Sequence, residues 1–219
     1  MKRIYMKSFI VCTFILMVLS AIPIQSQDLI ENPELDWKVE EFLNNRSRSW
    51  YDMNIPKSDG KLLFDIIIKN DYKSALEIGT STGHSGIWIA WALSKTGGKL
   101  ITIEIDKERY NEALQNFEEA GLSEYIDARN EDAHSLVPEL KGPFDFVFSD
   151  ADKNWYRNYF IAVDPKLVVG GCYTTHNVSR YGRGRNSGYL DYLISLDNYE
   201  TTVNSNGGGV AISYKRARK

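Results

Sequence analysis

Residues 77–86 read EIGTSTGHSG, the end of an apolar segment followed by a turn with three glycines and three consecutive hydroxyl residues. Glycine permits a tight turn and a close approach of the backbone to a ligand. The helix expected after the turn would direct its free N–H groups and the positive end of its dipole at an anion. An ordinary strand-to-helix turn requires only one glycine, so the pattern favours a ligand-binding turn. Its Glu-x-Gly-x-x-x-Gly spacing differs from the Gly-x-Gly-x-x-Gly of dinucleotide sites.

Strand-like and helix-like segments alternate on both sides of this turn. Apolar runs predict strands at 75–78, 100–105, 144–149, 167–175 and 210–214, and helical spacing of apolar residues predicts helices at 28–48, 57–70, 85–94, 107–120 and 154–163. Such alternation predicts an α/β fold with a doubly wound, mainly parallel sheet and helices on both faces. Residues 207–209 are all glycine and predict a hairpin turn, which would make the last strand antiparallel.

Acidic residues stand at the end of the predicted strand 100–105 and again at 131–132, where we expect the edge of the sheet at which ligands bind in such folds. Glu104 stands 27 residues after Glu77, near the spacing of a carboxylate that accepts the hydroxyls of a ribose. Asp106 immediately precedes a predicted helix, so we expect it to be the N-cap. Asp132 has two interpretations, a neighbour of an adenine ring or another helix cap.

The predicted strands 144–149 and 167–175 are also followed by polar groups. Asp150-Ala151-Asp152-Lys153 follows the first of these strands and His176-Asn177 follows the second. The two strands would be neighbours in the sheet, so we expect Asp150, Lys153, His176 and Asn177 to converge. Either segment alone could be explained by a helix cap or a surface lysine. The presence of both at neighbouring strand ends favours a shared site.

Together these motifs resemble the S-adenosylmethionine-dependent O-methyltransferases of the catechol and caffeoyl-coenzyme A type. The similarity rests on residues 77–85, 103–106, 150–153 and 176–177, and it extends from about residue 53 to 214. The resemblance implies a Rossmann-like, seven-stranded sheet with an antiparallel last strand and S-adenosyl-L-methionine as cofactor. It also implies methyl transfer to a hydroxyl of a small, phenolic or catechol-like acceptor, and it favours a homodimer.

The same resemblance implies roles for individual residues. The cofactor-binding positions would be Met53, Glu77, Gly79, Thr80, Ser81, Gly83, Ser85, Glu104, Asp132, Ala133 and Asp150. In the family, the positions of Asp150, His176 and Asn177 bind a divalent cation that chelates two neighbouring substrate oxygens. Lys153 would be the general base.

His176 departs from the family pattern, which has a second aspartate at this position. Magnesium prefers oxygen ligands, so an imidazole nitrogen favours manganese, iron or zinc, or no metal at all. Without a metal, His176 is itself a second candidate for the catalytic base. Both alternatives remain open at the level of the sequence.

Residues 1–26 differ from the rest of the chain. Three cations precede a nearly uncharged apolar run of 16 residues, from 9 to 24, which is typical of a signal peptide or of an N-terminal membrane anchor. We expect an exported, periplasmic or anchored protein, although supply of the cofactor would favour the cytoplasm. Residues 27–219 would form a single methyltransferase domain, with residues 27–56 as a helical cap over the substrate or against a second subunit.

Composition limits the remaining functions. The 219 residues carry a net charge of −3, with a sequence pI near 5.7, so no basic field favours nucleic-acid binding. Residues 180–185 are basic and glycine-rich, and they are either a solvated loop or a site for a carboxylate or phosphate. Two other functions remain open: an exported, non-catalytic binding protein that retains the fold, and a nicotinamide-dependent oxidoreductase.

Overall fold

The computed structural model describes residues 28–46, 54–178 and 187–218. The expectations for residues 1–26, for Met53 and for the basic segment 180–185 therefore lie outside the described residues. In the described part of the chain no helix has the length and apolar character needed to cross a bilayer.

Helices and strands alternate along the chain as the sequence predicts. The helices are α1 (Pro33–Arg46), α2 (Lys57–Asn70), α3 (His84–Thr96), α4 (Lys107–Glu119), α5 (Ala133–Glu139), α6 (Tyr156–Val163) and α7 (Ser187–Ile194), with short 3-10 turns at Ser123–Tyr125 and Asp164–Lys166. The strands are β1 (Ser74–Ile78), β2 (Lys99–Glu104), β3 (Ile126–Asn130), β4 (Phe144–Ser149), β5 (Leu167–His176), β6 (Tyr199–Asn204) and β7 (Val210–Lys215).

Within the described residues the seven strands form one sheet in the order β3-β2-β1-β4-β5-β7-β6. The pairs from β3 to β5 are parallel, whereas β7 is antiparallel to both β5 and β6. The predicted α/β fold, its mainly parallel sheet and its antiparallel last strand are therefore confirmed. The chain order reverses between β1 and β4, and a crevice forms at such a point in open α/β sheets.

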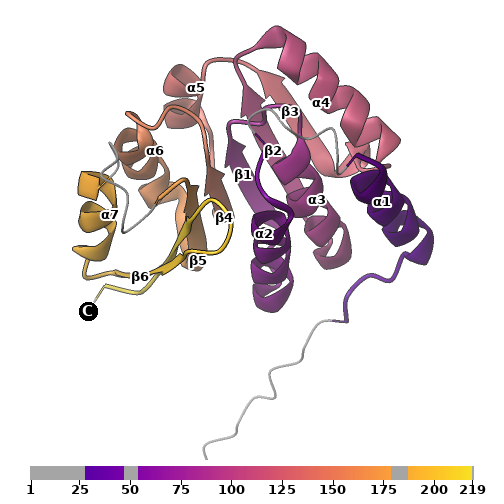
Figure 1. Cartoon of the computed structure of the whole chain (residues 1–219). Helices are drawn as coiled ribbons and strands as arrows, with labels where there is room; N and C mark the ends of the chain where they lie inside the picture. Colours follow the sequence, from indigo (N-terminus) through magenta and orange to yellow (C-terminus); the bar gives the residue numbers. More distant parts are fainter. Residues whose placement is uncertain (1–27, 47–53, 179–186, 219) are drawn as a thin grey trace, which may run out of the picture.

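Helices cover both faces of the sheet, so the molecule has three layers (Figure 1). Leu76 and Ile78 of β1 belong to a core with α5, α6 and α7. Ala75 of the same strand belongs to a core with α2 and α3. Helix α1 packs outside α3 and α4 through Leu35, Val39, Phe42 and Leu43. Burial on both faces explains why the strands read as nearly continuous apolar runs.

Four elements have weak signals in the sequence and were not predicted, among them strand β3, which is mostly polar and only partly buried. Helix α5 is seven residues long and contains Pro138, and helix α7 follows the undescribed segment 179–186. Strand β6 lies at an edge of the sheet and is mostly polar. Its pairing with β7 across the glycine turn at 207–209 confirms the predicted hairpin.

Candidate functional site

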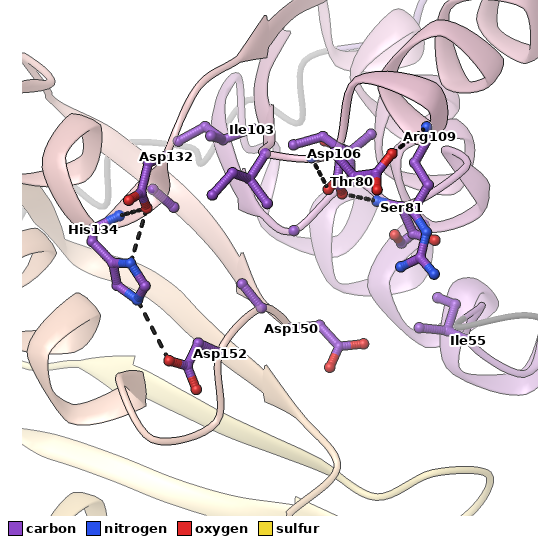
Figure 2. A pocket seen from close by; sticks show the side chains of 16 residues that line it. Ile55, Thr80, Ser81, Ile103, Asp106, Arg109, Asp132, His134, Asp150 and Asp152 are labelled. Carbon is purple, nitrogen blue, oxygen red and sulfur yellow. Dashed lines mark hydrogen bonds and ion pairs between the residues drawn. The ribbon is translucent and has the colours of Figure 1, made fainter.

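A cavity of about 490 Å³ opens at the carboxyl ends of β1, β2 and β4 (Figure 2). A volume of this order suits a ligand of nucleoside size. Its lining combines the glycine turn and the start of α3 with the end of β2, with the segments that follow β2, β3 and β4, and with one residue ahead of α2: Ile55, Gly79, Thr80, Ser81, Ser85, Ile103, Glu104, Ile105, Asp106, Arg109, Asp132, Ala133, His134, Asp150, Ala151 and Asp152. The cavity therefore lies where the sequence places the ligand site.

The glycine turn is fixed between β2 and the segment after β4. The N–H groups of Gly79 and Thr80 both donate to the carbonyl of Ile103, at 3.0 and 3.1 Å. Gly79 has φ +98°, and a Cβ there would lie 2.9 Å from the carbonyl oxygen of Asp150. Only glycine accommodates both this dihedral and this contact, so the turn needs Gly79 to form the floor of the cavity.

Glu104 stands at the end of β2 with its carboxylate held by two backbone donors. Ser81 N–H donates to Oε2 at 2.7 Å and Asp106 N–H donates to Oε1 at 2.9 Å. The side chain lines the cavity but is only 8% exposed. Glu104 thus presents acceptor oxygens in a fixed orientation, as a ribose site requires. Asp106 caps α4 by accepting from Glu108 and Arg109 N–H, which confirms its predicted role.

Glu77 lies behind the glycine turn and does not line the cavity. Thr102 Oγ donates to Glu77 Oε2, and Thr80 Oγ in turn lies 2.5 Å from Thr102 Oγ. Complete burial raises the pKa of Glu77 to about 7, and the charges of nearby acidic groups also raise it. Hydrogen bonds from Ser85 and Thr102 lower the pKa but do not outweigh burial. Glu77 therefore supports the turn from below, and its assignment to the cofactor site stays a prediction.

Gly83 also lies behind the lining, at the N-cap of α3 with φ +95°. A Cβ at Gly83 would come within 2.7 Å of the Phe117 ring, so this glycine allows α3 and α4 to approach each other. Ser85, in the first turn of α3, lines the cavity.

The opposite wall of the cavity consists of Asp132, His134 and Asp152 (Figure 2). Asp132 accepts from the backbone N–H of His134 at 2.9 Å, and it also lies 2.9 Å from Nδ1 of that ring. His134 Nε2 is 3.5 Å from Asp152 Oδ2, and Trp155 packs on the imidazole with ring centroids 4.2 Å apart. Both interpretations of Asp132 are compatible with this geometry, because the residue caps α5 and lines the cavity. His134 has no signal in the sequence, since α5 itself was not predicted.

His176 lies buried at the end of β5 between two carboxylates. Its Nδ1 is 2.8 Å from Asp150 Oδ2 and its Nε2 is 3.0 Å from Asp59 Oδ2. Burial lowers the pKa of His176, but the hydrogen bonds and charges of Asp150 and Asp59 outweigh it, and the net effect raises the pKa. Asp59 has no distinctive signal in the sequence, because an acidic residue in the first turn of a helix is ordinary.

The structure brings Asp150 and His176 into contact, with Asn177 next to His176 at the β6–β7 turn. Lys153 is exposed, three residues beyond Asp150, and Asn177 is half-buried with φ +56°. Neither side chain lines the cavity, whereas Asp150 and Ala133 do. The assignment of Lys153 as a base stays a prediction.

Comparisons with known proteins agree with this architecture. The family model described as O-methyltransferase matches residues 30–186. A catechol O-methyltransferase of Niastella koreensis is 38% identical over 112 residues, covering 49% of this chain and 50% of that protein. Caffeoyl-CoA O-methyltransferase 1 of Eucalyptus globulus is 33% identical over 127 residues, covering 56% and 51%. The chain thus matches about half the length of these curated relatives.

A solved structure shows the same fold. The O-methyltransferase from Bacillus cereus, in complex with SAH, superposes with a TM-score of 0.70 at 25% identity, over 83% of this chain and 91% of that chain. The family model covers most of the sequence and includes both the glycine turn and the strand ends that surround the cavity. This chain belongs to the O-methyltransferase family.

Proposed function

We propose that this chain binds S-adenosyl-L-methionine in the cavity and transfers its methyl group to a hydroxyl of a small acceptor of the phenol or catechol class. The observation that carries the proposal is the position of Glu104, which holds two fixed acceptor oxygens in a cavity of nucleoside size that the glycine turn borders. Membership of the O-methyltransferase family and the SAH complex of the Bacillus cereus relative support the same ligand.

In this proposal, each part of the cofactor would meet a different wall of the cavity. Glu104 would accept the ribose hydroxyls, and Asp132 with Ala133 would border the adenine. Ile105 is 65% exposed although it is a large apolar residue, and a bound adenine would cover part of its surface. The methionine carboxylate would lie by Gly79 and Ser85, near the N-terminus of α3, where a helix favours negative charge.

The transfer itself is an in-line displacement. The acceptor oxygen forms a bond to the methyl carbon as the carbon–sulfur bond breaks, and the sulfonium becomes the neutral thioether of SAH. The hydroxyl proton must leave, and Lys153 is the candidate to receive it in its unprotonated form. The enzyme contributes mainly by holding the oxygen against the methyl group in a fixed geometry.

Calorimetry with S-adenosylmethionine and SAH tests the cofactor site. We expect one site per chain, and we expect Glu104→Gln to weaken affinity by about 10- to 100-fold, since hydrogen bonds to a charged group contribute roughly 1.5–3 kcal/mol. Glu112→Gln, at an exposed position of α4, is the matched control and should bind normally. Absence of binding by the wild type would refute the proposed function.

A panel of phenols and catechols with methyl-labelled cofactor tests transfer. We expect Lys153→Ala to lower kcat while cofactor affinity is unchanged, and we expect exposed Lys141→Ala to keep both. Cofactor binding without transfer to any acceptor would favour the non-catalytic binding protein.

We propose further that residues 1–26 act as a signal peptide or membrane anchor, on the basis of the cationic start and the apolar run alone. Sequencing the N-terminus of the protein recovered from fractionated cells tests this. A new N-terminus near Gln27 outside the cytoplasm supports cleavage and export, whereas an intact chain in the cytoplasm contradicts both.

A further inference from the structure

The surroundings of His176 differ from those of a metal-binding histidine. A metal-bound imidazole gives the lone pair of one nitrogen to the ion and donates a hydrogen bond from the other. Here each nitrogen faces a carboxylate oxygen, Asp150 Oδ2 on one side and Asp59 Oδ2 on the other. Carboxylates are acceptors, so the arrangement is satisfied when both ring nitrogens donate, and then no lone pair remains for an ion.

The β6–β7 turn fills the space beside the Nε2 atom of His176. Gly208 donates its N–H to Asp59 Oδ2 at 2.8 Å. A Cβ at Gly208 would lie 2.4 Å from His176 Nε2, and a Cβ at Gly207 would lie 2.2 Å from Asp59 Oδ1. The backbone of this turn therefore packs directly on the pair. The His176 side chain is only 4% exposed, which leaves no room on this side for an ion that keeps its water ligands.

Asp150 likewise has a partner for each carboxylate oxygen. Its Oδ2 contacts His176, and its Oδ1 accepts from the hydroxyl of Tyr156 at 3.2 Å. Among the residues that the structure describes, no three or more His, Cys, Asp and Glu side chains form a group that could hold a metal ion. The donor set expected from the family resemblance thus does not fit a divalent cation in this chain.

We propose that the side chain of His176, clamped between Asp59 and Asp150, takes the place of the divalent cation, and that the chain binds and methylates its acceptor without metal chelation. The imidazole bridges two carboxylates that would otherwise repel each other in a buried space. His176 is a positioning residue in this arrangement, because it holds Asp150 at the rim of the cavity and does not line the cavity itself.

A consequence for the acceptor follows, and it rests on the proposed function. A metal that chelates two neighbouring oxygens selects for vicinal diols, whereas an imidazole with both nitrogens engaged offers no such bidentate site. The acceptor would then need only its reacting hydroxyl. We expect a catechol and its monomethyl ether to be used with kcat/KM values within about threefold of each other, because no lost chelate interaction of several kcal/mol separates them.

Manganese binding tests the inference without any turnover. Mn²⁺ is titrated into the full chain loaded with SAH, and free Mn²⁺ is followed by electron paramagnetic resonance. We expect no stoichiometric site in the wild type and one site in His176→Asp, which recreates an oxygen donor set with Asp150 and Asn177. Adding Asp150→Asn to that variant should remove the site again. Exposed Asp65→Asn, made in the wild type, is the matched control and should bind no Mn²⁺.

Three results would overturn the inference. One equivalent of Mn²⁺ bound by the wild type would do so, and this measurement stands even if His176→Asp fails to fold. A folded His176→Asp that binds no Mn²⁺ would show that the histidine is not what displaces the ion. Loss of transfer in a chelator by more than about 100-fold, with recovery on adding Mn²⁺, would show a catalytic metal worth several kcal/mol.

These outcomes are separable from failure of the proposed function. Absence of methyl transfer in every condition would bear on the function alone, since the Mn²⁺ titration needs no acceptor. Nitrogen-15 NMR supplies a further readout, in which two ring N–H signals assigned to His176 by comparison with His176→Gln support the clamp. A single ring N–H would contradict it.

Discussion

Substituting Glu77 by glutamine should change how stability depends on pH. The side chain is completely buried, and its neighbours include two other acids, Asp150 and Glu104, besides the hydroxyls of Ser85 and Thr102. Burial raises the pKa from an ordinary value of 4.5 to about 7. A group whose pKa is raised on folding stabilises the protein below its unfolded pKa, and this stabilisation is lost as the pH rises through the folded pKa.

The size of the effect follows from the two pKa values. Each unit of difference between the folded and unfolded pKa corresponds to roughly 1.4 kcal/mol. The free energy of unfolding of the wild type should therefore fall by about 3 kcal/mol relative to that of Glu77→Gln as the pH rises from below 4.5 to above 7. Glutamine resembles the protonated carboxyl in shape but cannot ionise. For a domain of this size the loss corresponds to a relative decrease in Tm of about 6–12 °C.

Thermal unfolding of both proteins between pH 5 and pH 9 measures this difference. Glu112→Gln removes an exposed carboxyl, and its Tm should differ from that of the wild type by the same amount at every pH in this range. The reasoning would be refuted by a Tm difference between wild type and Glu77→Gln that is the same at pH 5 and pH 9.

Three further changes test other parts of the structure. Gly79→Ala should destabilise the protein by about 1–3 kcal/mol and weaken cofactor binding, because φ +98° and the nearby Asp150 carbonyl exclude a side chain; an unchanged urea midpoint would contradict this. Asp36→Ala removes the acceptor of Trp91 Nε1 at 2.7 Å and the partner of Lys95, so we expect α1 to detach more readily from α3, with faster amide exchange in α1 and no change in β4. Burial raises the pKa of the Cys172 thiol, so peptide-level alkylation should label Cys172 only at the rate of unfolding; rapid labelling of the native protein would refute the buried position.

Local patterns in the sequence account for the fold and for one wall of the cavity. The glycine turn, Glu104 and Asp106 each lie next to the strand or helix that they serve, so spacing alone identifies them. Strand burial on both faces produced runs that are easily recognised.

Long-range contacts account for what the sequence could not indicate. Asp59 contacts His176, which lies 117 positions later in the sequence. Nothing in the neighbouring sequence distinguishes Asp59 from any other acidic residue in the first turn of a helix. His134 reaches the cavity from a short helix that contains proline. Glu77 and Gly83 belong to the recognised motif, yet the three-dimensional arrangement places both behind the cavity wall. A motif therefore identifies a region more reliably than it identifies which members touch the ligand.

The hydrogen bond from Gly208 to Asp59 joins residues 149 positions apart. Translation produces Asp59 early and the β6–β7 turn late, so for most of its synthesis the nascent chain carries this aspartate without its partner. The environment of His176 is complete only once the β6–β7 turn has been made, after β1 to β5 have all been synthesised. A step that holds the chain unfolded until synthesis ends, such as passage through a translocation channel, would remove this interval, because Asp59 and the β6–β7 turn would then be available at the same time.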